Sequence, residues 1–282
     1  MTVGKVGIVG CGLMGSGIAE VAARSGYATL VREMNDELVA KGRGRIEKSM
    51  NGAVERGKLP AAQRDEALGR LRFTTRLEEL ADCDLVVEAA TENPKLKKEI
   101  FAALDGACKR ETILASNTSS IPIIELAAVT KRPDRVVGLH FFNPVPVMKL
   151  VEVIKTIQSS DGSVAAARAF GESVGKRPII AKDRAGFVVN VLLVPYLLDA
   201  VRLVEQGVAS KEDIDEGMRL GCGYPMGPLQ LLDFVGIDTT YFIAEIMFDE
   251  FKDPHYAPPP LLKQMTIAGL HGRKTGRGFY TY

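Results

Sequence analysis

Short apolar runs alternate with helical patterns over the first two thirds of the chain. Residues 5–9 (KVGIV) form a β-branched run, and residues 84–89 (DLVVEA) and 112–116 (TILAS) are apolar runs typical of buried strands. Residues 135–139 (RVVGL) repeat the pattern, and the segment after Pro94 is helical in its spacing. Strands that alternate with helices predict an α/β fold whose parallel sheet is covered on both faces, with ligands at the carboxyl ends of the strands.

The last third of the chain has helical spacing alone. Residues 187–207 predict a long apolar helix that ends at a glycine, and residues 211–221 and 228–251 predict further helices. Their apolar positions exceed what one small helical domain needs to cover itself, so we expect a subunit interface. We therefore expect two domains, a doubly wound sheet domain with a helical hairpin insertion (residues 1–184) and an all-helical domain (residues 185–282).

A glycine-rich turn follows the first predicted strand directly. Gly10, Gly12 and Gly15 in GCGLMG have the spacing of a Rossmann-type dinucleotide site. The first glycine permits the tight turn, the second lets the backbone approach a pyrophosphate, and the third lets the following helix pack on the strand. The amides at the start of that helix favour phosphates, so the predicted cofactor site also includes Leu13 and Met14.

A second apolar run, residues 28–31 (ATLV), predicts the next strand, and an acid stands just after it, 23 residues after Gly10. A carboxylate at this position, Glu33, accepts hydrogen bonds from a ribose 2′-hydroxyl and repels a 2′-phosphate, which favours NAD over NADP. The neighbouring Arg32 weakens this preference, and NADP is not excluded. The alternative is an ordinary glycine turn and a surface glutamate.

Composition narrows the class of protein. The 282 residues carry 36 basic and 35 acidic side chains, a net charge of +1, which gives no general attraction to nucleic acid or a membrane surface. The four cysteines are far apart and form no C-x-x-C pair, so we expect neither a metal site nor disulfides. No apolar stretch reaches the roughly 18 residues that a membrane helix needs. We expect a cytoplasmic protein.

One histidine stands in an unusual setting. His140 lies in LHFFNP, directly after the strand at 135–139, and the chain has only three histidines. Glu152 follows twelve positions later, and the prolines between the two permit a chain reversal that would bring the carboxylate alongside the ring. We expect His140 to face the crevice at the sheet edge, whereas His255 and His271 are expected to face solvent.

Several segments together resemble one enzyme family. The chain is similar to the short-chain L-3-hydroxyacyl-CoA dehydrogenases, which include bacterial 3-hydroxybutyryl-CoA dehydrogenases. The likeness spans nearly the whole chain, and its segments are SNTSS (116–120), GLHFFNPVPVMKLVEVI (138–154), GFVVN (186–190), YPMGPLQLLDFVGID (224–238) and GRKTGRGFY (272–280). It implies an NAD-linked oxidoreductase that interconverts 3-hydroxybutyryl-CoA and acetoacetyl-CoA, and a homodimer formed through the helical domain.

The resemblance also assigns the catalytic residues. It makes His140 the general acid and base, Glu152 its orienting partner, and Ser119 and Asn190 the groups that hold the substrate oxygen. Histidine titrates near neutrality and suits reversible proton transfer, and a carboxylate on its far nitrogen fixes the tautomer. The alternatives are a core histidine, a structural salt bridge at Glu152, a helix cap at Ser119 and an incidental polar residue at Asn190.

Further ligand contacts follow from the same resemblance. Glu92, Lys97, Ser119 and Asn143 are expected to touch the cofactor, although Lys97 could equally be a helix-surface lysine.

A basic segment between residues 41 and 72 suggests a place for coenzyme A. It holds nine Lys or Arg against four acids, and Arg45, Lys48 and Arg56 share one helix face if the helix continues through this segment. The resemblance matches Ser49 and Arg56 to residues that contact the coenzyme. The alternative is a solvated helical hairpin.

Three positions depart from the family pattern. Glu33 stands for the usual aspartate, Ala185 for a common proline, and Val191 for a common arginine. None is among the four predicted catalytic residues. Two other functions stay open, a dehydrogenase of a free hydroxy acid of the gulonate type and a non-catalytic cofactor-binding structural protein. The joint presence of the four catalytic residues disfavours the structural protein.

Overall fold

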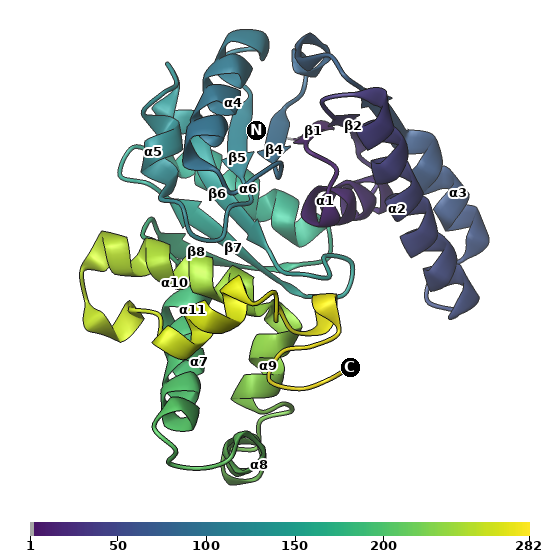
Figure 1. Ribbon diagram of the computed structural model, residues 1–282. Helices are drawn as coiled ribbons and strands as arrows, with labels where there is room; N and C mark the ends of the chain where they lie inside the picture. The colour runs from purple at the N-terminus through teal and green to yellow at the C-terminus, as the bar shows by residue number, and fades with distance from the viewer. Residues whose placement is uncertain (1–2) are drawn as a thin grey trace. The chain divides into compact units, whose positions relative to one another are not determined.

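The computed structural model describes residues 3–282, and internal contacts divide the chain into two compact units (Figure 1). The first unit ends at Arg184, and the second runs from Ala185 to Tyr282.

The first unit is built on one mixed sheet. Among the described residues eight strands pair in the order β3-β2-β1-β4-β5-β6-β7-β8. The strands β2 and β3 are added on one side of β1, and β4 to β6 are added on the other side. Such a switch point, here between β1 and β4, forms a crevice at the carboxyl ends of the strands. The strands are β1 (Lys5–Val9), β2 (Ala28–Arg32), β3 (Leu71–Thr74), β4 (Leu85–Glu88), β5 (Ile113–Ser116), β6 (Val136–Phe141), β7 (Leu150–Lys155) and β8 (Arg177–Lys182).

The strands from β3 to β6 are parallel, and β7 turns back against β6. In that antiparallel pair His140 lies opposite Glu152. The chain reversal expected from the prolines between these two residues is therefore confirmed.

Helices cover both faces of this sheet. Alternate residues of β4 point to opposite faces, so Leu85 and Val87 join the cluster that contains Ile18 of α1, while Val86 is buried on the other face. Burial on both sides explains why these strands are continuous apolar runs. In Figure 1, α2 and α3 form a hairpin beside α1. The helices are α1 (Leu13–Arg24), α2 (Asp36–Glu55), α3 (Ala61–Arg70), α4 (Pro94–Ala107), α5 (Ile123–Ala127) and α6 (Asp161–Ser173).

The second unit is helical and has its own apolar core. Gly207, with φ of 66°, follows the long helix α7 at the predicted end. The single helix expected over 228–251 is wrong, because Gly236 adopts φ of 110° and separates α9 from α10. The helices are α7 (Val189–Glu205), α8 (Lys211–Gly221), α9 (Pro228–Val235), α10 (Ile237–Phe251) and α11 (Pro260–Ile267).

Within residues 3–282, no helix combines the length and the apolar character that crossing a bilayer requires.

Candidate active site

The glycine-rich turn between β1 and α1 has the geometry that its sequence predicts. Gly10 adopts φ of 90°, and a Cβ atom there would lie 2.6 Å from the Ala90 Cα. A Cβ on Gly15 would lie 1.8 Å from the Gly10 carbonyl oxygen, so a side chain would push α1 away from the turn. Around Gly12, by contrast, the space is open within 4 Å among the described residues. The turn therefore packs closely on the protein side and leaves its backbone accessible to a ligand.

The first turn of α1 fits an anionic ligand. Gly12 is the N-cap and has no side chain to accept hydrogen bonds from the first amides of the helix. These amides can face a phosphate. Leu13 is about 66% exposed, and Met14 is half-buried at the edge of the apolar cluster.

Glu33 lies against the same turn. One carboxylate oxygen accepts a hydrogen bond from the Cys11 amide at 2.5 Å, and the other accepts from the Met34 amide at 3.1 Å. Arg45 of α2 donates to the Cys11 carbonyl at 3.1 Å, so α2 also contacts the turn. Burial, followed by the Glu33 charge, raises the pKa of Cys11 to about 12. The predicted ribose acid is thus held beside the predicted phosphate loop.

A buried ion pair joins the carboxyl end of β4 to α4. The Lys97 ammonium lies 2.6 Å from a Glu88 carboxylate oxygen, and the two side chains are about 1% and 0% exposed. Ser116, the last residue of β5, donates to the same oxygen at 2.8 Å, and the other Glu88 oxygen accepts from the Ala90 amide. The alternative of a helix-surface lysine at position 97 is wrong. Its contact with a cofactor stays a prediction.

Ser119 follows β5 in a loop fixed by Glu92. The Glu92 carboxylate accepts from the Thr118 hydroxyl at 2.6 Å and from the Ser119 amide at 3.2 Å. Ser119 does not cap the helix that follows. The first amides of α5 donate instead to the Asp183 carboxylate, at 2.8 and 2.7 Å. The helix-cap alternative for Ser119 is therefore wrong.

His140 and Glu152 form a buried pair across β6 and β7. The His140 Nδ1 atom lies 2.6 Å from Glu152 Oε2, and the residues are about 6% and 0% exposed. The Phe142 ring packs at 4.5 Å from the His140 ring, centroid to centroid. The Asn117 side chain accepts from the Phe141 amide at 2.9 Å, which joins the β5 loop to β6. A ring held in this way has its orientation fixed by the carboxylate.

The remaining predicted residues differ in how exposed they are to solvent. Asn143 is exposed just after β6, and Asn190 is about 9% exposed in the first turn of α7, in the second unit. His255 is exposed, as predicted. The prediction for His271 is wrong, since it is half-buried and its Nε2 lies 3.0 Å from the Thr266 carbonyl oxygen.

The helix that carries the basic segment is continuous. Helix α2 runs through Gly52 to Glu55, and Arg56 is its C-cap, so Ser49 and Arg56 lie on one side two turns apart. The Arg56 guanidinium lies over Gly52, 3.0 Å from where a Cβ would be. Ser49 is half-buried and Arg56 exposed, which leaves both the coenzyme site and the solvated hairpin open.

Two buried or half-buried acids that position these elements, Glu88 and Asp183, were not predicted from the sequence. Glu88 ends an apolar strand, and an acid inside such a run is a signal of a buried ion pair. Asp183 carries no comparable signal, because its partners on α5 lie about 60 residues earlier.

Both units match models of one protein family. Residues 5–184 match the NAD-binding domain of 3-hydroxyacyl-CoA dehydrogenase, and residues 186–282 match its C-terminal domain. The chain belongs to the 3-hydroxyacyl-CoA dehydrogenase family. The family resemblance, the α/β class and the helical second domain predicted from the sequence are therefore confirmed. The matched NAD-binding domain also supports NAD as the cofactor.

Curated relatives and a solved structure agree with this membership. A 3-hydroxybutyryl-CoA dehydrogenase of Mycobacterium tuberculosis is 54% identical over 280 residues, 99% of this chain and 98% of that protein. The human mitochondrial hydroxyacyl-coenzyme A dehydrogenase is 45% identical over 98% of this chain and 90% of its own. The crystal structure of (S)-3-hydroxybutyryl-CoA dehydrogenase from Ralstonia eutropha superimposes with a TM-score of 0.96 at 46% identity, covering 100% of this chain and 99% of that one.

Proposed function

We propose that this protein interconverts short-chain L-3-hydroxyacyl-CoA and 3-ketoacyl-CoA, with 3-hydroxybutyryl-CoA and acetoacetyl-CoA as the main pair. The observation that carries the proposal is the buried His140–Glu152 pair at the sheet edge where a dinucleotide fold binds its ligand. Family membership over both units supports the substrate class.

His140 exchanges the substrate's proton. Its Nδ1 is bonded to Glu152, so transfer to and from the substrate oxygen falls to Nε2. In the reductive direction the imidazolium donates this proton to the ketone oxygen, and in the oxidative direction the neutral ring accepts it from the hydroxyl. The Glu152 carboxylate keeps the proton on Nδ1 and stabilises the imidazolium. When bound, the nicotinamide cofactor supplies or accepts the hydride at the neighbouring carbon.

Ser119 and Asn190 hold the substrate oxygen in this proposal. A hydroxyl and an amide bond the oxygen without titrating near neutrality, so proton transfer is left to His140. The Glu92 carboxylate supports Ser119, because it binds the Ser119 amide and the preceding Thr118 hydroxyl.

The residues at the first turn fit NAD. Gly10, Gly12 and Gly15 shape the loop, the first amides of α1 (Leu13 and Met14) face the pyrophosphate, and Glu33 receives the adenosine ribose. Glu92, Lys97, Ser119 and Asn143 complete the cofactor site at the neighbouring strand ends. The Glu33 charge disfavours a 2′-phosphate, so we propose NAD in preference to NADP.

The coenzyme A part of the substrate binds along α2. Ser49 and Arg56 lie on one side of that helix, and Arg56 is an exposed cation suited to a phosphate. The variant Arg56→Glu is expected to raise the KM for acetoacetyl-CoA by roughly tenfold or more while the Kd for NADH stays unchanged, because it reverses one charge at a phosphate contact. Arg64→Glu, on α3, is the matched control, and an unchanged KM in Arg56→Glu would remove this site.

The second unit forms a homodimer interface in this proposal. Leu192, Tyr224 and Phe234 are exposed by about 71%, 46% and 47%, and they line an apolar hollow of about 630 Å³ between α7 and α9. Apolar patches of this kind mark interaction surfaces.

We place the enzyme in the cytoplasm, since all four cysteines are free thiols.

The rate of NADH oxidation with different substrates distinguishes this function from the two alternative functions. Acetoacetyl-CoA, free acetoacetate and longer 3-ketoacyl-CoAs are supplied in turn, and each assay is repeated with NADPH. The proposal predicts a kcat/KM for acetoacetyl-CoA at least about 10²-fold above that for acetoacetate, since a free acid lacks every contact to the coenzyme. Preference for the free acid would favour a gulonate-type dehydrogenase, and no turnover with any substrate would favour a structural protein.

A further inference from the structure

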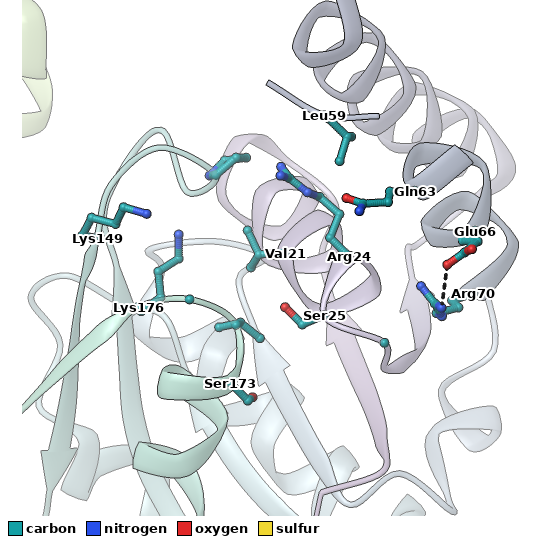
Figure 2. A pocket seen from close by; sticks show the side chains of 14 residues that line it. Val21, Arg24, Ser25, Leu59, Gln63, Glu66, Arg70, Lys149, Ser173 and Lys176 are labelled. Carbon is teal, nitrogen blue, oxygen red and sulfur yellow. Dashed lines mark hydrogen bonds and ion pairs between the residues drawn. The ribbon is translucent and has the colours of Figure 1, made fainter. Parts of the chain in front are cut away.

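A cavity lies in the first unit, at the opposite end of α1 from the glycine-rich turn. It encloses about 630 Å³ between the end of α1, helix α3, the β6–β7 loop and the turn before β8 (Figure 2). The glycine-rich turn lies at the other end of α1. Arg24, which lines the cavity, is twelve residues from Gly12, a distance of roughly 18 Å along a helix. The cavity is therefore separate from the predicted dinucleotide site.

Positive charge dominates the walls of this cavity. Arg24, Arg70, Lys149 and Lys176 line it, against the single acid Glu66. A chain with a net charge of only +1 thus concentrates cations at one place. A local field of this kind attracts anions.

Partners neutralise the two arginines. Arg70 lies 3.3 Å from Glu66, an ion pair marked by the dashed line in Figure 2. Arg24 lies 3.1 Å from the buried Glu20. Among residues 3–282 neither Lys149 nor Lys176 has a carboxylate within ion-pair distance. The excess positive charge of the cavity therefore resides on these two lysines.

Lys176 is held in place by two carbonyl oxygens and not by an ion pair. It is about 9% exposed and donates to the carbonyl oxygens of Val145 and Met148, the latter at 2.9 Å. An ammonium has three donors, so one is left for a further partner. Burial, then the charges of Lys149 and Arg24, lowers the pKa of Lys176, and the Glu20 charge opposes them with a smaller effect. A buried cation next to two other cations gains most from an anion brought between them.

We propose that this cavity binds a phosphate-bearing organic molecule of nucleotide size, with a phosphate group between Lys149 and Lys176. In Figure 2 both ammonium groups point into the same space. A volume of about 630 Å³ exceeds the needs of a single inorganic ion and lies within the range of organic ligand pockets. Gln63 and Ser25 line the rest and offer uncharged hydrogen-bonding groups to the remainder of the molecule.

Two sources share this chemistry, the phosphate tail of an acyl-CoA substrate and a separate phosphorylated metabolite. Lys149 precedes Glu152 by three residues on the segment that becomes β7, roughly 10 Å in an extended chain. A substrate bound at His140 could thus extend toward the cavity. The binding itself does not depend on the proposed function.

Calorimetric titration tests the site without turnover. The probes are inorganic tripolyphosphate and ATP, added to protein saturated with NADH so that the dinucleotide site is filled. The variant is Lys149→Gln, because Lys149 is exposed and its replacement leaves the fold intact. Lys182→Gln is the matched control, an exposed lysine at the end of β8 outside the cavity. Loss of one charge-assisted contact predicts a Kd raised about tenfold in Lys149→Gln and by less than about twofold in the control.

Two results would overturn the proposal. One is the absence of binding of both probes by the native protein at millimolar concentration, and the other is equal weakening by Lys149→Gln and Lys182→Gln. A protein that binds tripolyphosphate through Lys149 but does not reduce acetoacetyl-CoA would refute only the proposed function.

Free coenzyme A and acetoacetyl-pantetheine distinguish the two sources. If the substrate tail occupies the cavity, coenzyme A displaces tripolyphosphate, and Lys149→Gln raises the KM for acetoacetyl-CoA but leaves the KM for acetoacetyl-pantetheine unchanged. If a separate metabolite binds, tripolyphosphate binds equally well beside coenzyme A, and both KM values stay at the native level. Either pattern supports a phosphate site.

Discussion

Two buried carboxylates, Glu88 and Glu152, organise the carboxyl edge of the sheet. Both are fully buried, and each lies 2.6 Å from a basic side chain, Lys97 and His140 respectively. A buried charge without a partner is costly, so each pair fixes the position of the element that supplies its base. The first pair ties α4 to β4, and the second holds the proposed catalytic ring against β7.

Removing one member of the first pair should show this cost. In Lys97→Met the Glu88 carboxylate stays buried without its ammonium, and the free energy of unfolding is expected to fall by about 3–5 kcal/mol. Urea denaturation measures the change. Lys95→Met, an exposed position on the same helix, should change it by less than about 0.5 kcal/mol.

The double variant Glu88→Gln/Lys97→Met removes both charges and should recover part of the loss. If the midpoint of urea unfolding is the same for Lys97→Met as for the native protein, the pair does not stabilise this edge.

At the scale of elements, the glycine-rich turn depends on close packing between β1 and α1. The Gly15→Ala variant places a Cβ against the Gly10 carbonyl and should displace the first turn of α1, whose amides face the proposed pyrophosphate. We expect the Kd for NADH, measured by fluorescence titration, to rise by at least about tenfold, since this loop positions the charged part of the cofactor.

Gly44→Ala is the control for that variant. Gly44 lies within α2 with open space around it, so alanine there should leave NADH binding unchanged and stabilise the helix by about 0.5–1 kcal/mol. Native NADH affinity in Gly15→Ala would show that the turn is not the cofactor loop.

Strands buried on both faces were the elements that the sequence predicted well. The strand β1 matches its apolar run at both ends, and β4, β5 and β6 differ from theirs by one or two residues at an end. The strands β3 and β8 were missed. β3 has only four residues, and β8 is half-exposed at the sheet edge, so neither has a clear apolar pattern.

Contacts within the site were predictable from the sequence where a short chain reversal brings two residues together. His140 and Glu152 meet because a reversal between two strands brings them opposite each other. The partner of Lys97 was not predictable, since Glu88 lies on a strand nine residues earlier and Ser116 on another strand 19 residues later. Only the order of strands in the folded sheet brings those three residues together.

At the scale of the whole molecule, the second unit exposes an apolar surface that a monomer would leave in contact with water. We expect the native protein to be a dimer by light scattering and Leu192→Glu to be largely monomeric, because a charge buried in an interface core is costly. Ile157→Glu is the control, since Ile157 is about 96% exposed in the first unit. A native monomer at micromolar concentration would contradict the proposed interface.

The kcat of His140→Ala for acetoacetyl-CoA reduction by NADH tests the central claim most directly. His140 is the proposed acid and base, and loss of such a group lowers the rate by about 10² to 10⁴-fold. The account predicts a loss of this size with an unchanged Kd for NADH, because the glycine-rich turn and Glu33 are untouched. A loss below about tenfold, with cofactor binding intact, would contradict it.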